Sequence, residues 1–190
     1  MGIFELPEGY SEIKRINLQK DKKLAVLVNI GAVIIAIALF FLGLFIVPFE
    51  ITIKGDVAGI LLSPLPFFLS IILYLLSHEL IHGLFIKKYS GKRARYGFTG
   101  LYAYAGSDAF FNKRQYIIIA LAPVVLWGAV FLLLNIFLPV EFFWSVYFLQ
   151  IINLSGAAGD FYITLLVIRL PADILTNDEG VAMVIYSRAE

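Results

Sequence analysis

The sequence predicts an all-α integral membrane protein with about four transmembrane helices, a short cytoplasmic loop resembling a β-hairpin, and a strand in the tail. Of its 190 residues, 61% are hydrophobic and only 15% are charged, whereas soluble domains are about 25% charged. Four apolar stretches approach or exceed the roughly 20 residues that span a bilayer. The basic residues cluster in segments that this arrangement places on one side of a membrane.

The four predicted helices belong to one domain, residues 1–190, and cover about 24–47, 59–86, 116–138 and 142–170. Proline often follows the end of a helix, and it stops the first, third and fourth stretches at Pro48, Pro139 and Pro171. Pro123 lies inside the third stretch and predicts a kink. The loop 87–115 and the tail 171–190 carry turn residues and short apolar runs, so we expect short strands that pair with each other.

Lysine and arginine set the predicted orientation. They gather before the first helix, between the second and third, and after the fourth, whereas the two opposite connections contain only Lys54. Because basic segments stay in the cytoplasm, we expect a multi-pass protein with both termini cytoplasmic. The formal net charge is only +1, which gives no electrostatic support for a nucleic-acid partner.

The second apolar stretch contains the motif His78-Glu79-Leu80-Ile81-His82, which holds both histidines of the chain. Positions four apart lie on one helical face, about one turn from each other. His78 and His82 can therefore bind one Zn²⁺, with Glu79 beside them as a general base. Ionisable side chains inside a membrane helix are rarely tolerated without a function. The alternative is a histidine pair that binds no metal.

A catalytic zinc site normally has three protein ligands. The chain has no cysteine and no further histidine, so the third ligand must be a carboxylate. Asp160 lies nine residues before Arg169, as His78 lies nine before Lys87, which places both roughly 13 Å inside the same membrane face. Asp160 is thus the predicted ligand. The alternative is an acid that hydrogen-bonds a neighbouring helix.

Two neighbouring features have weaker predictions. Asn153 lies within about 20° of Asp160 on a continuous helix, and it can steady a substrate carbonyl or the oxyanion, or simply bridge two helices. The small residues 155–159 between them allow close helix packing. The aromatic loop segment 96–104 suits a membrane interface, or an edge strand that holds an extended substrate.

These motifs resemble intramembrane zinc metalloproteases of the site-2 protease type, which carry His-Glu-x-x-His in one membrane helix and an Asn…Asp pair in a later one. Leu6-Pro7-Glu8-Gly9-Tyr10, the histidine motif and the segment 153–160 are more specifically similar to a family of small four-helix membrane proteins described as "putative zincin peptidases", over nearly the whole chain. The resemblance implies a prokaryotic plasma (inner) membrane location. It also implies the following roles: zinc ligands His78, His82 and Asp160, general base Glu79, and substrate-assisting Asn153.

The functional hypothesis is a zinc-dependent intramembrane or juxtamembrane endopeptidase, with membrane lipid and a membrane-associated polypeptide substrate as its partners. The alternative is a non-catalytic membrane scaffold or adaptor whose zinc fixes two helices together. A metal transporter is disfavoured, because only one site is evident and no second row of ionisable residues lines a path. The sequence predicts no particular oligomeric state or substrate.

Overall fold

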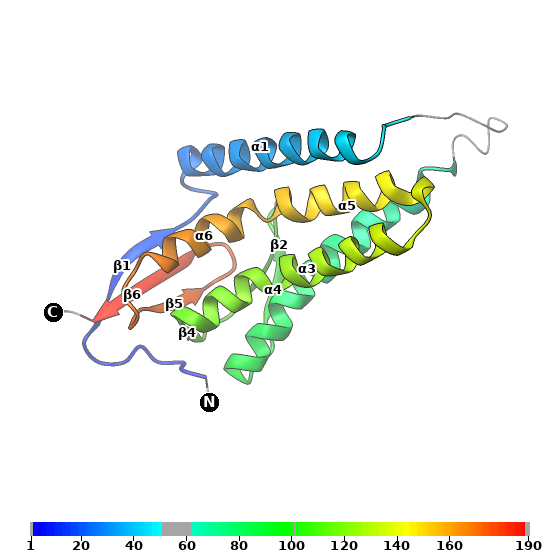
Figure 1. The fold of residues 1–190 in the computed structure, drawn as a ribbon. Coiled ribbons are helices and arrows are strands. Elements are labelled where there is room, and N and C mark those ends of the chain that lie inside the picture. Colours follow the sequence, from blue (N-terminus) through cyan, green and yellow to red (C-terminus); the bar gives the residue numbers. More distant parts are fainter. Residues whose placement is uncertain (1, 51–61, 101, 189–190) are drawn as a thin grey trace.

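The computed structural model describes residues 2–50, 62–100 and 102–188, and most of these residues are helical. Within these residues, three helices are long and apolar enough to cross a membrane: α1 (Lys22–Ile46), α3 (Leu65–Ser90) and α4 (Lys113–Phe137). A fourth span is formed if α5 (Phe143–Gly156) and α6 (Ala158–Ile168) are counted together. The long helices run beside one another, and the larger sheet and both termini lie at one end of them (Figure 1).

Local capping interactions explain where several helices begin and end. The Asp21 carboxylate accepts a hydrogen bond from the Leu24 N–H at 3.0 Å and starts α1. Asn112 and Gln115 form a reciprocal capping box at the start of α4. Gly91 ends α3 with a φ of 79°, a left-handed conformation that glycine adopts without a steric penalty. α3 therefore continues past the predicted end at residue 86, whereas its predicted start at residue 59 lies outside the described residues.

The predicted helix over 142–170 corresponds to two helices, α5 and α6, which together are long and apolar enough for one bent span. A short 3₁₀ turn, η1 (Val140–Phe142), leads into α5, and the chain breaks at Ala157 before α6 with a bend of 43°. The break falls within the small residues 155–159, which include Gly156 and Gly159. Glycine has low helix propensity, and Gly/Ser pairs are recurrent positions of helix kinks.

Four antiparallel strands cover one end of the helices in the order β1-β6-β5-β4. They are β1 (Tyr10–Ile16), β6 (Met183–Arg188), β5 (Leu175–Asp178) and β4 (Phe110–Asn112). The loop and the tail thus pair through β4 and β5. β1 was not expected, and it pairs with β6 along its length, with a bulge between Glu12 and Lys14. The buried core below this sheet includes Ile86, Phe111, Ile174 and Ile185.

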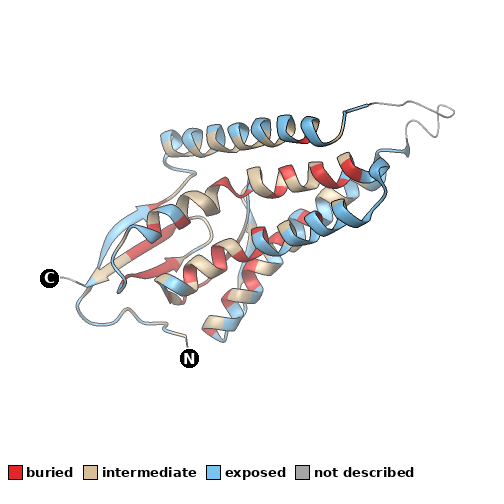
Figure 2. Cartoon of the chain, viewed as in Figure 1, coloured by how far each residue is buried: buried red, intermediate tan, exposed pale blue. Residues whose placement is uncertain are grey.

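A separate hairpin, β2 (Arg95–Phe98) and β3 (Ala103–Gly106), follows α3. The buried residues concentrate in the larger sheet and on the facing sides of α3, α4, α5 and α6, whereas α1 is almost entirely exposed or intermediate (Figure 2). Only Gly43 of α1 is buried. The main buried cluster of the described residues therefore lies where the larger sheet packs against α3, α4 and α6.

Candidate metal centre

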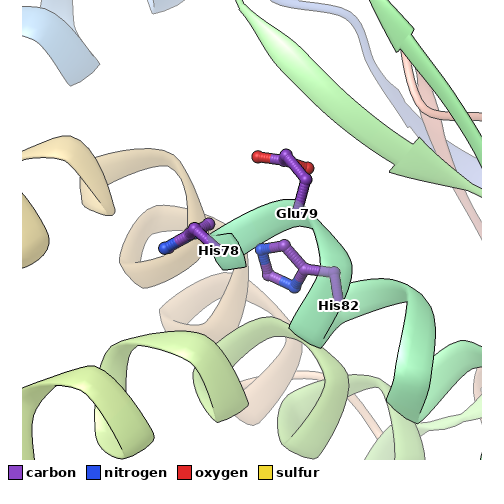
Figure 3. Close-up of side chains that lie close together, drawn as sticks. All are labelled: His78, Glu79 and His82. Carbon is purple, nitrogen blue, oxygen red and sulfur yellow. The ribbon is translucent and has the colours of Figure 1, made fainter. Parts of the chain in front are cut away.

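Three ionisable side chains leave one stretch of α3 close together (Figure 3). His78, Glu79 and His82 each have a potential ligand atom within 4.8 Å of the other two. The two imidazole centroids are 4.9 Å apart, and each histidine is only 8% exposed. Because residues four apart lie on one face of a helix, this spacing places both rings on one buried face of α3.

Asp160 comes to this pair from the first turn of α6. Its Oδ2 atom lies 3.5 Å from Nε2 of His78 and 3.7 Å from Nε2 of His82. Ligands bound at 2.0–2.1 Å in a tetrahedral zinc site are roughly 3.3–3.4 Å apart. The two separations from Asp160 exceed this value by a few tenths of an ångström or less. Imidazole nitrogen and carboxylate oxygen are both ligands that zinc accepts, so the chemistry of these three groups suits zinc.

The other nitrogen of each imidazole also has a hydrogen-bond partner. Nδ1 of His82 lies 2.8 Å from the backbone carbonyl oxygen of Ile119, and Nδ1 of His78 lies 3.1 Å from the hydroxyl of Tyr74. Histidines that bind metals usually donate their second N–H to a carbonyl, carboxylate or water. Both rings therefore turn Nε2 towards Asp160, as metal ligands would.

Asn153 is placed differently from Asp160. Its side chain is fully buried, accepts a hydrogen bond from the Tyr74 hydroxyl at 3.1 Å, and donates one to the Val124 carbonyl at 3.1 Å. It is absent from the described residues that line the cavity around the histidines, whereas Asp160 is among them. The break at Ala157 lies between the two residues, so they do not share one continuous helical face.

A cavity of about 220 Å³ opens on this site. Glu79, Asp160 and Asp178 contribute carboxylates to its wall, and none of the described residues that line it is a lysine or an arginine. Asp178 accepts hydrogen bonds from the Tyr116 hydroxyl at 2.8 Å and the Gly180 N–H at 2.9 Å. Burial raises the pKa of Asp178, and these two hydrogen bonds partly oppose the rise.

The hairpin β2–β3 forms another wall of the cavity through Thr99 and the segment 102–105. The Tyr104 ring lies between two glycines, since a Cβ atom added at either Gly97 or Gly180 would collide with it. The Asn29 side chain of α1 donates a hydrogen bond to the Tyr102 hydroxyl at 3.3 Å. The hairpin is thus attached both to the β5–β6 turn and to α1.

The sequence predictions did not include three groups at this site: Tyr74, the Ile119 carbonyl, and the Tyr116–Asp178 pair. Tyr74 lies four residues before His78 on the same helix face, which is a signal that spacing provides. Asp178 lies in the tail 171–190, and the pairing of β5 with β4 and β6 brings it to the cavity. The sequence predicts paired strands in the loop and the tail, but not the register that places Asp178 there.

Comparisons with known proteins agree with the geometry of the site. A family described as "putative zincin peptidase" matches residues 70–175, a range that includes the histidine motif, Asn153 and Asp160. No curated protein and no solved structure matches the chain. The matched range covers more than half of the chain and contains His78, Glu79, His82 and Asp160. The chain therefore belongs to the family described as "putative zincin peptidase".

Proposed function

We propose that this protein is a zinc-dependent endopeptidase that hydrolyses peptide bonds of membrane-associated polypeptides. The observation that carries the proposal is the convergence of His78, His82 and Asp160, with Oδ2 of Asp160 at 3.5 and 3.7 Å from the two Nε2 atoms. A zinc ion bound by these atoms would act as a Lewis acid on a water molecule and on the scissile carbonyl.

Glu79 is the proposed general base. Its carboxylate faces the same cavity as the metal-binding atoms, and it lies within 4.8 Å of the ligand atoms of both histidines. A carboxylate in this position can take a proton from the attacking water and return it to the amine that leaves. Three proposed ligands leave the fourth position of a zinc ion open for water, whereas a structural zinc site is usually closed by a fourth protein ligand. The proposed ligand set therefore favours an enzyme over the alternative scaffold.

The exposure of the helices supports a location in a membrane. In α1 none of the most apolar 18-residue window is buried, and a helix that is apolar on all sides is stable in lipid rather than in water. Lys22 begins α1, Lys87 and Lys88 lie in the last turn of α3, and Lys113 begins α4. These ends carry the cations expected on the cytoplasmic side, which would place the metal centre towards the cytoplasm.

The hairpin suggests how a substrate is held. β3 pairs with β2 on one edge, and no other strand of the described residues pairs with it. Ala103 and Tyr104 of β3 line the cavity that contains Glu79. An extended peptide is the form that a protease must bind, and a free strand edge can hydrogen-bond such a peptide. We infer that an unwound segment of the substrate lies between β3 and the histidines.

Variants of the site test the proposal in purified protein. We expect His78→Ala and Asp160→Ala to lose bound zinc, measured by elemental analysis, because each removes one of three ligands. We expect Glu79→Gln to keep zinc and to lose cleavage, because glutamine cannot accept the proton. Cleavage is measured by mass spectrometry of new termini in single-span model peptides in bicelles.

The outcomes separate the candidate functions. Normal cleavage by Glu79→Gln protein would overturn the mechanism, and wild-type protein that binds no zinc would overturn the metal site itself. The scaffold would be favoured if wild-type protein bound zinc but cleaved nothing, and if only the ligand variants lost the zinc. The Tyr147→Phe variant is a control, because its hydroxyl bonds the Leu39 carbonyl at 2.8 Å and takes no part in the metal centre.

The proposed orientation can be tested separately because the chain contains no cysteine. Ser11 of β1 and Glu141 of η1 are both exposed and belong to opposite ends of the helices. In spheroplasts, whose plasma membrane is intact and accessible from outside, a membrane-impermeant maleimide should label Glu141→Cys and not Ser11→Cys. The reverse pattern would overturn the cytoplasmic placement of the site.

A further inference from the structure

The proline inside α4 leaves one backbone carbonyl without its helical partner. In an α-helix the N–H of residue 123 would donate to the carbonyl of residue 119, but Pro123 has no N–H. Pro123 is fully buried and Ile119 is only 3% exposed. The Ile119 carbonyl oxygen is consequently a free acceptor in the interior of the protein, where an unpaired polar group is costly.

His82 supplies the missing donor. Its Nδ1 atom lies 2.8 Å from the Ile119 oxygen. A carbonyl oxygen can only accept, so the bond requires a hydrogen on Nδ1 of His82. In a neutral imidazole the other nitrogen then carries a lone pair, and this nitrogen, Nε2, is the one that lies 3.7 Å from Asp160.

His78 is oriented by a separate chain of hydrogen bonds that starts at another helical carbonyl. The Val124 oxygen can only accept, so the Asn153 amide turns Nδ2 towards it and Oδ1 towards Tyr74. The single hydroxyl hydrogen of Tyr74 is thereby directed to Asn153.

The remaining capacity of the Tyr74 oxygen is to accept, and its neighbour at 3.1 Å is Nδ1 of His78. His78 therefore also carries its hydrogen on Nδ1. Its Nε2 lone pair is turned towards Asp160, 3.5 Å away. Two separate hydrogen-bond arrangements, the Ile119 carbonyl for His82 and the Tyr74–Asn153 pair for His78, thus place the hydrogen on Nδ1 in both rings.

We propose that Pro123 and the Tyr74–Asn153 pair are positioning residues that fix both histidines as Nδ1–H tautomers, with Nε2 free to bind the metal. The inference rests on the proposed zinc site. It assigns Pro123 a role beyond the kink that the sequence predicts, and it gives Asn153 a structural task away from substrate.

The tautomers can be measured directly in metal-free protein. The chain has only two histidines, so ¹⁵N-histidine labelling of untagged protein gives the signals of these two imidazoles alone. At mildly alkaline pH we expect each ring to show a protonated Nδ1 and an unprotonated Nε2. A protonated Nε2 on either neutral ring would overturn the proposal. The measurement needs neither zinc nor cleavage, so its outcome is independent of whether the protein is a peptidase.

Single substitutions test the two hydrogen-bond arrangements separately. Tyr74→Phe removes the acceptor of His78 and should mix the tautomers of that ring alone, whereas Pro123→Ala restores an N–H that competes for the Ile119 carbonyl and should mix those of His82 alone. Loss of partners of this kind typically weakens metal binding about 10–100-fold, and we expect zinc affinity to fall by that factor.

Tyr147→Phe and Pro139→Ala are the matched controls, since each makes the same chemical change away from the site, and neither should alter the imidazole signals. Equal spectra in wild-type, Tyr74→Phe and Pro123→Ala proteins would overturn the proposal, as would equal perturbation by the controls. Where a variant fails to fold, the tautomers of the wild-type protein still decide.

Discussion

Replacing Gly180 by alanine tests whether Tyr104 fixes the hairpin β2–β3 against the wall of the cavity. Gly180 has a φ of 89°, and a Cβ atom added to it would lie 2.5 Å from Cε2 and 3.1 Å from Cγ of Tyr104. The ring cannot simply retreat, because its opposite side is close to Gly97. Gly100 provides a matched control, because it has the same φ of 89° and its added Cβ would meet nothing within 4 Å.

The expected cost has two parts. A left-handed backbone costs an alanine roughly 1–2 kcal/mol, and this part is common to both positions. Overpacking costs a further 1–3 kcal/mol, approximately, and it applies at Gly180 alone. Gly180→Ala should therefore lower the free energy of unfolding by roughly 2–5 kcal/mol and Gly100→Ala by roughly 1–2 kcal/mol.

Thermal unfolding of the purified protein in micelles measures this difference. For a chain of this length, each kcal/mol shifts the midpoint by about 2–4 °C, so the Gly180 variant should melt clearly below the Gly100 variant. In a Tyr104→Ala background, the two substitutions should cost the same, because the ring that Gly180 accommodates is gone. Equal melting of the two single variants, or a difference that persists without Tyr104, would refute the packing argument.

Two further predictions concern Asp178 and the helix break. Because burial raises the pKa of Asp178, the folded chain binds this proton more tightly than the unfolded chain, and the free energy of unfolding should fall as pH rises above about 4. Asp178→Asn should remove this part of the slope in melting profiles taken across pH, and parallel profiles would contradict it. Added Cβ atoms at Gly156 and Gly159 meet nothing within 4 Å. The double alanine variant should therefore gain roughly 1–2 kcal/mol of helix propensity, straighten the break and lose zinc by displacing Asp160; unchanged zinc content would refute this.

Features that depend on local pattern could be predicted from the sequence. The helices follow from long apolar runs with capping residues, and the face shared by His78 and His82 follows from their spacing. The strand β1 could not be predicted in this way. Its residues are mostly polar, and it is a strand because Tyr10 to Ile16 pair with β6 at the other end of the chain. Pairing between distant segments is determined by the tertiary fold, and no window of the sequence contains both partners.

The candidate site shows the same division. Distances along straight helices predict a carboxylate at the depth of the histidines. The surroundings of that carboxylate, however, depend on the bend between α5 and α6, which a straight helix does not contain. Pro123 is visible in the sequence as a helix irregularity. Its second consequence, the free carbonyl of Ile119, becomes chemically meaningful only once α3 is known to place His82 against α4.

The break at Ala157 explains how one segment supplies two residues with different tasks. On a continuous helix, Asn153 and Asp160 would lie on one face, about 10 Å apart along the axis. The 43° bend gives them separate directions. Asn153 remains in α5 and bonds Tyr74 of α3 and the Val124 carbonyl of α4, while Asp160 lies in the first turn of α6, where free N–H groups and the helix dipole favour a negative charge. Two irregularities therefore shape the site around the regular helix α3, which supplies both histidines. The proline in α4 leaves the carbonyl that accepts from His82, and the break before α6 sets the position of Asp160.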